Sequence, residues 1–166
     1  SSQTQELIKI TFAVKGKYTK RMADKLTKGK DVWLKLPYGD IFDRGHSLEK
    51  CVFIAGGTGI TPFLSLFTSN SFSDYIKPRL YFGVRKFSHN IFNEELERSK
   101  NINRGFETYL VEQDKHGMLC IDNIFNDVPA GSTFFLSGPQ MMIKNFKLFL
   151  IQHGIAASEV ITDNWE

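Results

Sequence analysis

Strand-length apolar runs alternate with helix-length segments over residues 51–161, and this alternation limits the fold more than any other feature of the sequence. The expected strands cover residues 51–55, 80–84, 106–111, 133–136 and 160–161. The expected helices run to about residue 67 after the first strand, then over residues 90–98, 121–125 and 139–153. Such connections are right-handed and place successive strands in parallel. The pattern predicts an α/β fold, a doubly wound five-stranded parallel sheet with flanking helices, its first strand buried on both faces.

Residues 1–45 follow a different pattern. Alternating apolar residues over 7–14 and 31–36 predict two strands, separated by a short helix over 19–26 that Thr19 caps at its N-terminus. Residues 37–40 (Pro-Tyr-Gly-Asp) are typical of a turn, and the polar stretch 40–50 indicates a linker. Two domains are expected, over residues 1–45 and 46–166. Because the chain begins Ser-Ser rather than Met, we expect a fragment that lacks upstream strands of its first domain.

Composition excludes several classes of protein. The chain has 166 residues, 42% of them apolar, which is enough to bury a core without disulfides. Cys51 and Cys120 form no Cys-x-x-Cys pair and the four histidines are scattered, so we expect reduced thiols and no metal site. Residues 1–50 hold eleven Lys and Arg against six Asp and Glu. These cations are dispersed without interleaved aromatic side chains, which indicates a solvated face and no nucleic-acid partner.

A glycine-rich turn, Ala-Gly-Gly-Thr-Gly-Ile-Thr-Pro over residues 55–62, follows the first expected strand. Glycine lets the backbone approach a ligand closely and adopt positive φ. Thr61 is a capable N-cap and Pro62 suits the first turn of a helix, where free N–H groups favour a diphosphate. The alternative is a tight turn without a ligand. Three glycines followed by Thr-Pro favour a nucleotide site at the carboxyl end of the strand.

The second expected strand ends in Gly83-Val84-Arg85-Lys86, with no acidic residue along the chain until Glu94. In dinucleotide folds this position meets the adenosine ribose, where an acid binds a free 2′-hydroxyl and a basic residue accommodates a 2′-phosphate. Arg85 and Lys86 therefore predict a preference for NADPH over NADH. The alternative is that Arg85 ends the strand in solvent.

Four ordered segments resemble the ferredoxin–NADP reductase superfamily and together extend over nearly the whole chain. They are residues 36–40 (Leu-Pro-Tyr-Gly-Asp), 53–63 around the glycine-rich turn, 135–142 (Phe-Leu-Ser-Gly-Pro-Gln-Met-Met) and 160–165 (Val-Ile-Thr-Asp-Asn-Trp). Residues 14–19 (Val-Lys-Gly-Lys-Tyr-Thr) are similar to a segment of the ferric reductase and NADPH oxidase branch. Leu36 and Ser137 depart from the glycine and the cysteine that the family usually has there.

The resemblance implies a flavin reductase module that passes hydride from NADPH or NADH to FAD, with residues 1–45 forming the last strands of a flavin-binding β-barrel. The implied pyrophosphate-binding loop contains Gly56, Gly57, Thr58, Gly59, Thr61 and Pro62. The residues implied beside the nicotinamide are Ser137, Gly138 and Pro139. Tyr18 and Thr19 would begin a helix that faces the flavin diphosphate.

Two C-terminal residues acquire roles from the same resemblance. Trp165 would cover the flavin face, and its alternative role is an aromatic side chain that fills a groove. Asp163 would assist proton balance, and its alternative is an exposed carboxylate. The resemblance also places Met141 near the nucleotide, although its helical spacing with Met142, Phe146, Phe149 and Leu150 is typical of core packing. Phe63 and Phe67 are likewise expected in the core, and Asp114 and His116 in a solvated loop.

Partners follow from the resemblance as well. They are the upstream flavin-barrel segment and an electron acceptor, either a haem-containing membrane domain or an iron–sulfur protein. The implied location is the cytoplasm, as a free protein or as the cytosolic domain of a membrane protein. A soluble ferredoxin- or flavodoxin-type reductase and a non-catalytic nucleotide-sensing module remain alternatives. A dehydrogenase for a small organic substrate is disfavoured because the sequence contains no Tyr-x-x-x-Lys pair.

Overall fold

The computed structural model describes residues 8–35, 41–43 and 45–163. Its centre is a sheet of five parallel strands in the order β3-β2-β1-β4-β5. The strands are β1 (Cys51–Gly56), β2 (Arg79–Val84), β3 (Glu107–Glu112), β4 (Thr133–Ser137) and β5 (Val160–Thr162). The α-helices are α1 (Lys17–Lys25), α2 (Thr61–Phe67), α3 (Asn93–Ile102), α4 (Gln113–His116), α5 (Ile121–Asp127) and α6 (Gln140–Gln152). The predicted doubly wound parallel sheet is confirmed.

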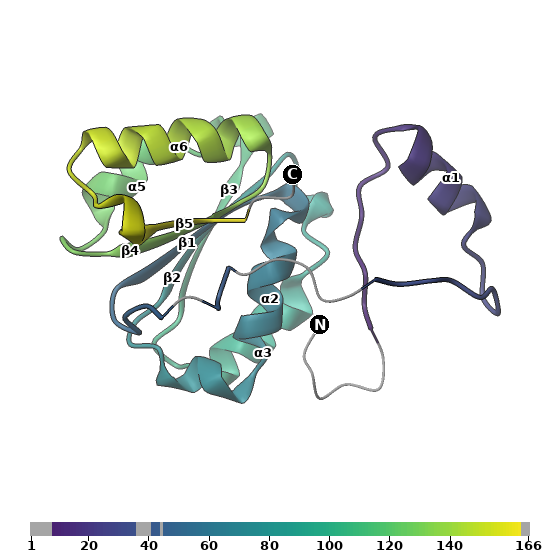
Figure 1. Cartoon of the computed structure of the whole chain (residues 1–166), viewed down its shortest axis with the longest axis horizontal. Helices are drawn as coiled ribbons and strands as arrows, with labels where there is room; N and C mark the ends of the chain where they lie inside the picture. Colours follow the sequence, from purple (N-terminus) through teal and green to yellow (C-terminus); the bar gives the residue numbers. More distant parts are fainter. Residues whose placement is uncertain (1–7, 36–40, 44, 164–166) are drawn as a thin grey trace.

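Strand β1 supplies both layers of the core, because successive side chains of a strand point to opposite faces. Phe53 is buried in the cluster that includes α2 and α3, and Ile54 is buried in the cluster that includes α5 and α6. Figure 1 shows these two helical layers on opposite faces of the sheet. The α2 layer is aromatic: Phe53 stacks on Phe135 at a centroid distance of 4.8 Å and meets Phe67 edge-on at 5.0 Å. The predicted burial of Phe63 and Phe67 is confirmed.

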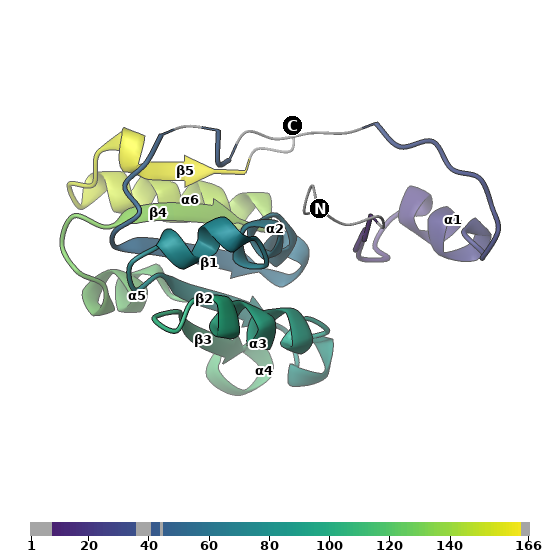
Figure 2. The ribbon, with the colours of Figure 1, turned by 90° about the horizontal axis from the view of Figure 1, so that it is seen from below.

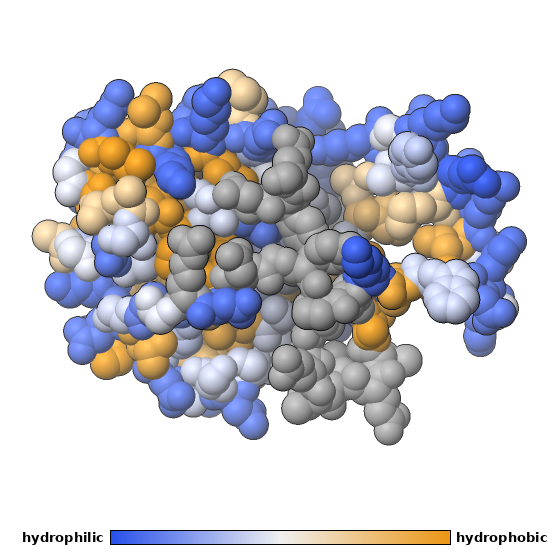
Figure 3. Space-filling model, in the orientation of Figure 1, coloured by the Kyte–Doolittle hydropathy of each residue, from blue (hydrophilic) through white to orange (hydrophobic). Residues whose placement is uncertain are grey.

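The N-terminal segment, defined here as residues 8–35, does not form the two predicted strands. Its residues 8–14 and 31–35 are in no strand. A strand needs a neighbouring backbone to pair its N–H and C=O groups, and the described chain pairs none with these residues. Helix α1 has no buried residue and stands away from the sheet (Figures 1 and 2). Aliphatic side chains are exposed along the segment, as the orange atoms at the right of Figure 3 illustrate, and Trp33 is completely exposed.

Helix α1 begins at Lys17, and its N-cap is Gly16 rather than Thr19. Thr19 occupies the third helical position instead. There its Oγ1 accepts hydrogen bonds from the backbone N–H groups of Lys15 and Gly16, each at 3.0 Å. This is the reach-back contact of a capping box, made by threonine in place of the usual Glu or Gln. The predicted N-cap is therefore wrong, although the Thr19 hydroxyl still stabilises this end of the helix.

Apolar contacts anchor the linker to the sheet. Ile41 is buried, and the Phe42 ring lies 6.3 Å from that of Phe63 and 5.7 Å from that of Phe135. His46 Nε2 lies 2.7 Å from the Tyr75 hydroxyl. Residues 41 and 42 thus already pack against the sheet, while the domain boundary between residues 45 and 46 stays a prediction. The predicted turn over 37–40, with the preceding residue 36, lies outside the described residues.

The remaining differences from prediction lie in the helices. Helix α3 begins at Asn93 rather than at Asn90, whose side chain accepts a hydrogen bond from the Phe92 N–H at 3.2 Å and so favours a turn over a helix. Met141, predicted in the core, is 64% exposed on α6, whereas Leu150 is buried as predicted. No helix within the described residues is long and apolar enough to cross a membrane.

Candidate functional site

The carboxyl ends of β1 and β4 mark the point where the sheet topology reverses. From β1 the chain moves outward to β2 and β3, and it then returns to the other side of β1 as β4. Ala55 pairs with Ser137, so the loops that follow β1 and β4 start beside each other. Open α/β sheets bind ligands in the crevice at such a switch point. We use the name β1–β4 crevice for residues 56–62 and 137–139 at this switch point. The structure brings together these two segments, which the sequence analysis assigns to the nucleotide.

Three glycines let the two loops of the crevice touch. A Cβ on Gly59 would lie 2.5 Å from the Gly138 Cα, and one on Gly138 would lie 2.9 Å from the Gly56 backbone nitrogen. A Cβ on Gly56 would lie 2.7 Å from the Pro139 Cδ. These distances are shorter than any side chain tolerates. Gly56, Gly59 and Gly138 are therefore required for loop–loop packing, whatever else they contact.

Gly57 differs from the other glycines of the loop. Its φ is +56°, which favours glycine, and no atom lies within 4 Å of where its Cβ would be. The position is thus bare backbone facing open space at the rim of the crevice. Thr58, beside it, is exposed. This is the kind of surface to which a phosphate chain can approach closely, and the residues present fit a dinucleotide in this respect.

The turn after Gly56 is tighter than predicted. Residues Gly57–Ile60 form a 3₁₀ turn that runs directly into α2, and the N-cap of α2 is Ile60. Thr61 is therefore the first helical residue rather than the cap, and Pro62 is the second. The Thr61 hydroxyl donates a hydrogen bond to the Thr58 carbonyl at 2.9 Å, which fixes the turn. The predicted cap is wrong because the 3₁₀ turn already satisfies that end of the helix.

Ser137 and Asp163 form a buried pair at the ends of β4 and β5. Ser137 Oγ donates a hydrogen bond to Asp163 Oδ2 at 3.1 Å. Ser137 is 0% exposed and Asp163 is 5% exposed. The Asp163 backbone N–H also donates to the Leu136 carbonyl at 3.0 Å. The alternative of an exposed carboxylate is therefore wrong. The structure brings Asp163 to the same strand end as Ser137, while Trp165 lies outside the described residues.

At the ends of β2 and β3 lies a charged cluster that the sequence did not reveal. Arg85 and Lys86 directly follow β2, as predicted, and both side chains are largely exposed. Asp114, predicted in a solvated loop, belongs to α4, and its carboxylate lies 4.0 Å from Arg85 Nε and 3.9 Å from Lys86 Nζ. The register of β2 and β3 explains this proximity: Val84 pairs with Glu112, so the residues that follow them are neighbours. An acid thus stands beside the two cations in space, although none follows them closely in the chain.

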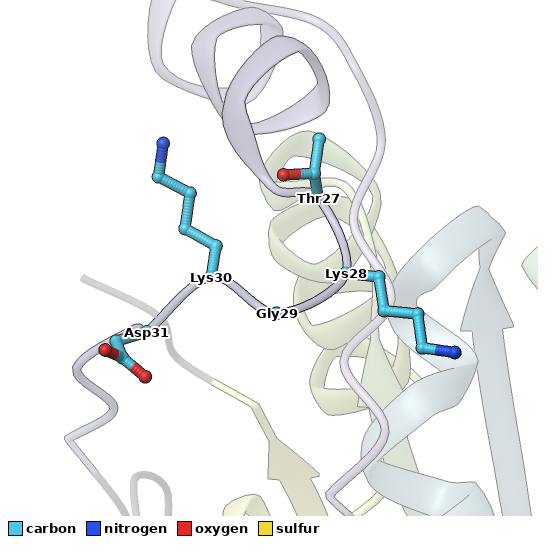
Figure 4. A pocket seen from close by; sticks show the side chains of 5 residues that line it. All are labelled: Thr27, Lys28, Gly29, Lys30 and Asp31. Carbon is cyan, nitrogen blue, oxygen red and sulfur yellow. The ribbon is translucent and has the colours of Figure 1, made fainter.

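The predicted flavin contacts lie apart from the crevice. Tyr18 is 84% exposed on α1, and the N-terminal segment stands on the side of the sheet to which the strand arrows point (Figure 2). A shallow concavity lies after α1, lined by Thr27, Lys28, Gly29, Lys30 and Asp31. The side chains of Lys28 and Lys30 point in different directions (Figure 4), so they do not converge on a ligand. Met141 is exposed near the start of α6.

Comparison with known proteins matches the crevice to a nucleotide-binding family. The family model described as oxidoreductase NAD-binding domain matches residues 53–147, more than half of the chain. This match contains both loops of the crevice and the charged cluster. No curated protein matches the sequence.

Solved structures share the fold at low identity. A flavohemoglobin from Malassezia yamatoensis with bound FAD and heme is 19% identical, with a TM-score of 0.70 over 93% of this chain and 42% of its own. The CS and b5R domains of human Ncb5or in the NAD+ form are 16% identical, with a TM-score of 0.65 over 93% and 48%. A point mutant of Plasmodium falciparum ferredoxin–NADP+ reductase with 2′P-AMP is 17% identical, with a TM-score of 0.55 over 78% and 56%. The chain therefore spans about half the length of these proteins.

Proposed function

Because the chain belongs to the oxidoreductase NAD-binding domain family, we propose that it binds NADPH or NADH in the β1–β4 crevice and is the nucleotide-binding part of a flavin reductase. The observation that carries this proposal is the pair of touching glycine loops at the topological switch point, with Gly57 bare at their rim. A phosphate chain needs such a rim because a side chain there would hold it away from the backbone N–H groups.

The nucleotide has two proposed contacts with the crevice. The loop over 56–62 takes the pyrophosphate, and residues 137–139 lie beside the nicotinamide ring. When bound, the reduced nicotinamide supplies a hydride that a flavin accepts. The protein's own task is to orient the ring and exclude water. Asp163 contributes by accepting a hydrogen bond from the buried Ser137 hydroxyl, which fixes the end of β4 from which residues 138 and 139 continue.

FAD is the proposed acceptor of the hydride. The flavohemoglobin of similar fold was solved with FAD, and this chain matches it over its N-terminal segment as well as its sheet. Tyr18 and Thr19 then face the flavin diphosphate, and Trp165 covers the flavin. Residues 14–19 favour the ferric reductase and NADPH oxidase branch. The electron acceptor beyond FAD is a haem-containing membrane domain or an iron–sulfur protein, and the module lies in the cytoplasm.

Two measurements test this function. Isothermal titration of the chain with NADPH and NADH should show saturable binding of at least one nucleotide. Anaerobic mixing with NADPH should bleach bound FAD when the chain is joined at its N-terminus to an FAD-binding β-barrel. Binding without bleaching in that joined protein would contradict the reductase and favour a nucleotide-sensing module. Absence of binding would contradict both.

The chain alone should purify without FAD. Its N-terminal segment forms no strand within the described residues, so it offers the isoalloxazine no sheet to lie against. An absorption spectrum after gel filtration measures this directly. Stoichiometric bound FAD would contradict the assignment of the N-terminal segment to an incomplete flavin site.

A further inference from the structure

The cluster of Arg85, Lys86 and Asp114 joins the ends of two neighbouring strands. The Asp114 backbone N–H donates a hydrogen bond to the Arg85 carbonyl at 3.2 Å, which holds the start of α4 against the end of β2. The Asp114 carboxylate then lies about equally far from Arg85 Nε and Lys86 Nζ, at 4.0 and 3.9 Å. Backbone geometry therefore fixes where this acid stands, independently of the two side-chain ion pairs.

The ion pairs of the cluster are loose. The side chains of Arg85, Lys86 and Asp114 are 75%, 59% and 42% exposed, and both pair distances are at the long limit for such contacts. Exposed pairs of this kind contribute little to stability. The two cations can therefore turn from Asp114 to a bound anion at low cost, but the carboxylate remains beside that anion because its backbone is held.

Lys115, which follows Asp114 on α4, does not add to the cluster. Lys115 Nζ pairs with Glu112 at 2.9 Å, one turn back along the chain. An incoming phosphate group thus meets two cations and one fixed acid. It gains attraction from Arg85 and Lys86 and loses part of it to repulsion by Asp114. A ribose hydroxyl in the same place is neutral and donates a hydrogen bond, which a carboxylate accepts well.

We propose that Asp114 is a specificity-determining residue, which lowers the preference of this chain for a 2′-phosphorylated dinucleotide relative to one with a free 2′-hydroxyl. The inference rests on the proposed nucleotide site, with the adenosine ribose at the end of β2. It makes the cluster a balance: Arg85 and Lys86 favour NADPH, and Asp114 opposes them. The ratio of the two affinities then depends in part on an acid that lies far from the two cations along the chain.

The test is the ratio of dissociation constants for NADH and NADPH, measured by titration of the whole chain. Asp114→Asn keeps the size of the side chain and the backbone hydrogen bond but removes the charge. We expect it to tighten NADPH binding by about three- to ten-fold, because it removes the repulsion between one carboxylate and one phosphate in water. Binding of NADH should be unchanged or weaker. Asp74→Asn is the matched control, because Asp74 is exposed before β2, at the opposite end of the sheet.

A second variant separates local from general effects. In Arg85→Ala the further change Asp114→Asn should raise the NADH-to-NADPH ratio less than it does alone, since the two residues act on the same phosphate. An unchanged ratio in Asp114→Asn, or an equal shift in Asp74→Asn, would overturn the inference while leaving the nucleotide site intact. Failure of the unaltered chain to bind either nucleotide would instead remove the proposed function, and the inference with it.

Discussion

The N-terminal segment and the sheet domain use similar apolar side chains in opposite ways. In the sheet domain the β1 residues 51–55 are all buried, between helices on both faces. The N-terminal segment has an apolar alternation that predicts strands, at Ile8, Ile10, Val32 and Leu34. Each of these residues is nevertheless about half exposed to solvent. The difference is that β1 has a paired backbone on each side, whereas no strand among the described residues pairs with the N-terminal segment.

This contrast separates self-sufficient structure from structure that needs a partner. The sheet domain closes its own core, and both loops of the β1–β4 crevice belong to it. The N-terminal segment presents apolar surface that burial elsewhere would stabilise. We therefore expect stability and nucleotide binding both to belong to the sheet domain.

Stability should depend on the sheet domain and hardly at all on the N-terminal segment. Phe53→Ala removes a fully buried ring that contacts Phe135 and Phe67, and should cost roughly 3–5 kcal/mol of unfolding free energy. Ile10→Ala, at an exposed position, should stay within about 0.5 kcal/mol. Urea unfolding of both variants measures the two losses. Comparable losses would erase the distinction between the regions.

Nucleotide binding should depend on the bare backbone at Gly57. Gly57→Val places a branched side chain in the open space of the rim and should weaken binding by on the order of a hundred-fold or more. Gly154→Val is the matched control, because Gly154 also has positive φ and open space around it but follows α6 at the other end of the sheet. Both variants should lose similar stability, and only Gly57→Val should lose binding. Equal affinity in the two folded variants would remove the loop from the site.

The choice of nucleotide should depend on Arg85. A guanidinium that binds a 2′-phosphate through two parallel N–H bonds contributes about 1.5–3 kcal/mol, so Arg85→Ala should weaken NADPH binding by roughly ten- to a hundred-fold and spare NADH. Dissociation constants for both nucleotides in both proteins measure the effect. Equal affinities in the unaltered chain, or a variant that keeps its preference, would contradict this role.

The smallest effect should come from the ion pair between Lys9 and Glu95, which links the N-terminal segment to α3 of the sheet domain. Burial raises the pKa of Glu95, but the hydrogen bond and charge of Lys9, a backbone hydrogen bond and the charge of Arg98 together outweigh it, so the folded pKa lies below the ordinary value. The pair therefore stabilises the fold above the unfolded pKa of Glu95 and loses this contribution as pH falls through the folded pKa. Because Lys9 is largely exposed, Lys9→Ala should change unfolding free energy by only about 0.5 kcal/mol or less near neutral pH and by less still in acid. A larger change would mean that the regions stabilise each other.

Local patterns predicted the sheet well and the N-terminal segment poorly, for one physical reason. The run over 51–55 is apolar at every position, as expected for a strand buried on both faces. Residues 8–14 and 31–35 have an equally clear alternation, but a strand also needs a partner, and alternation does not reveal whether one is present. The cap assigned to Thr19 failed because α1 begins two residues earlier, at Lys17. The cap assigned to Thr61 failed because α2 continues directly from a 3₁₀ turn.

The candidate site was predicted where its parts lie close along the chain. The turn over 56–62 is one local motif, and its glycine content is visible in the sequence. The pairing of Ser137 with Asp163 and the approach of Asp114 to Arg85 each need two strand ends to meet. Such contacts follow from strand order and register, which the sequence pattern does not specify.

The central claim is that the β1–β4 crevice binds the pyridine nucleotide, and amide chemical shifts during titration with NADP+ test it most directly. We predict that saturating shifts concentrate in residues 56–61, in Arg85 and Lys86, and in Ser137 and Gly138, while amides of the N-terminal segment stay unchanged. Shifts that saturate elsewhere in the chain, or none at nucleotide concentrations well above those of cells, would contradict the claim.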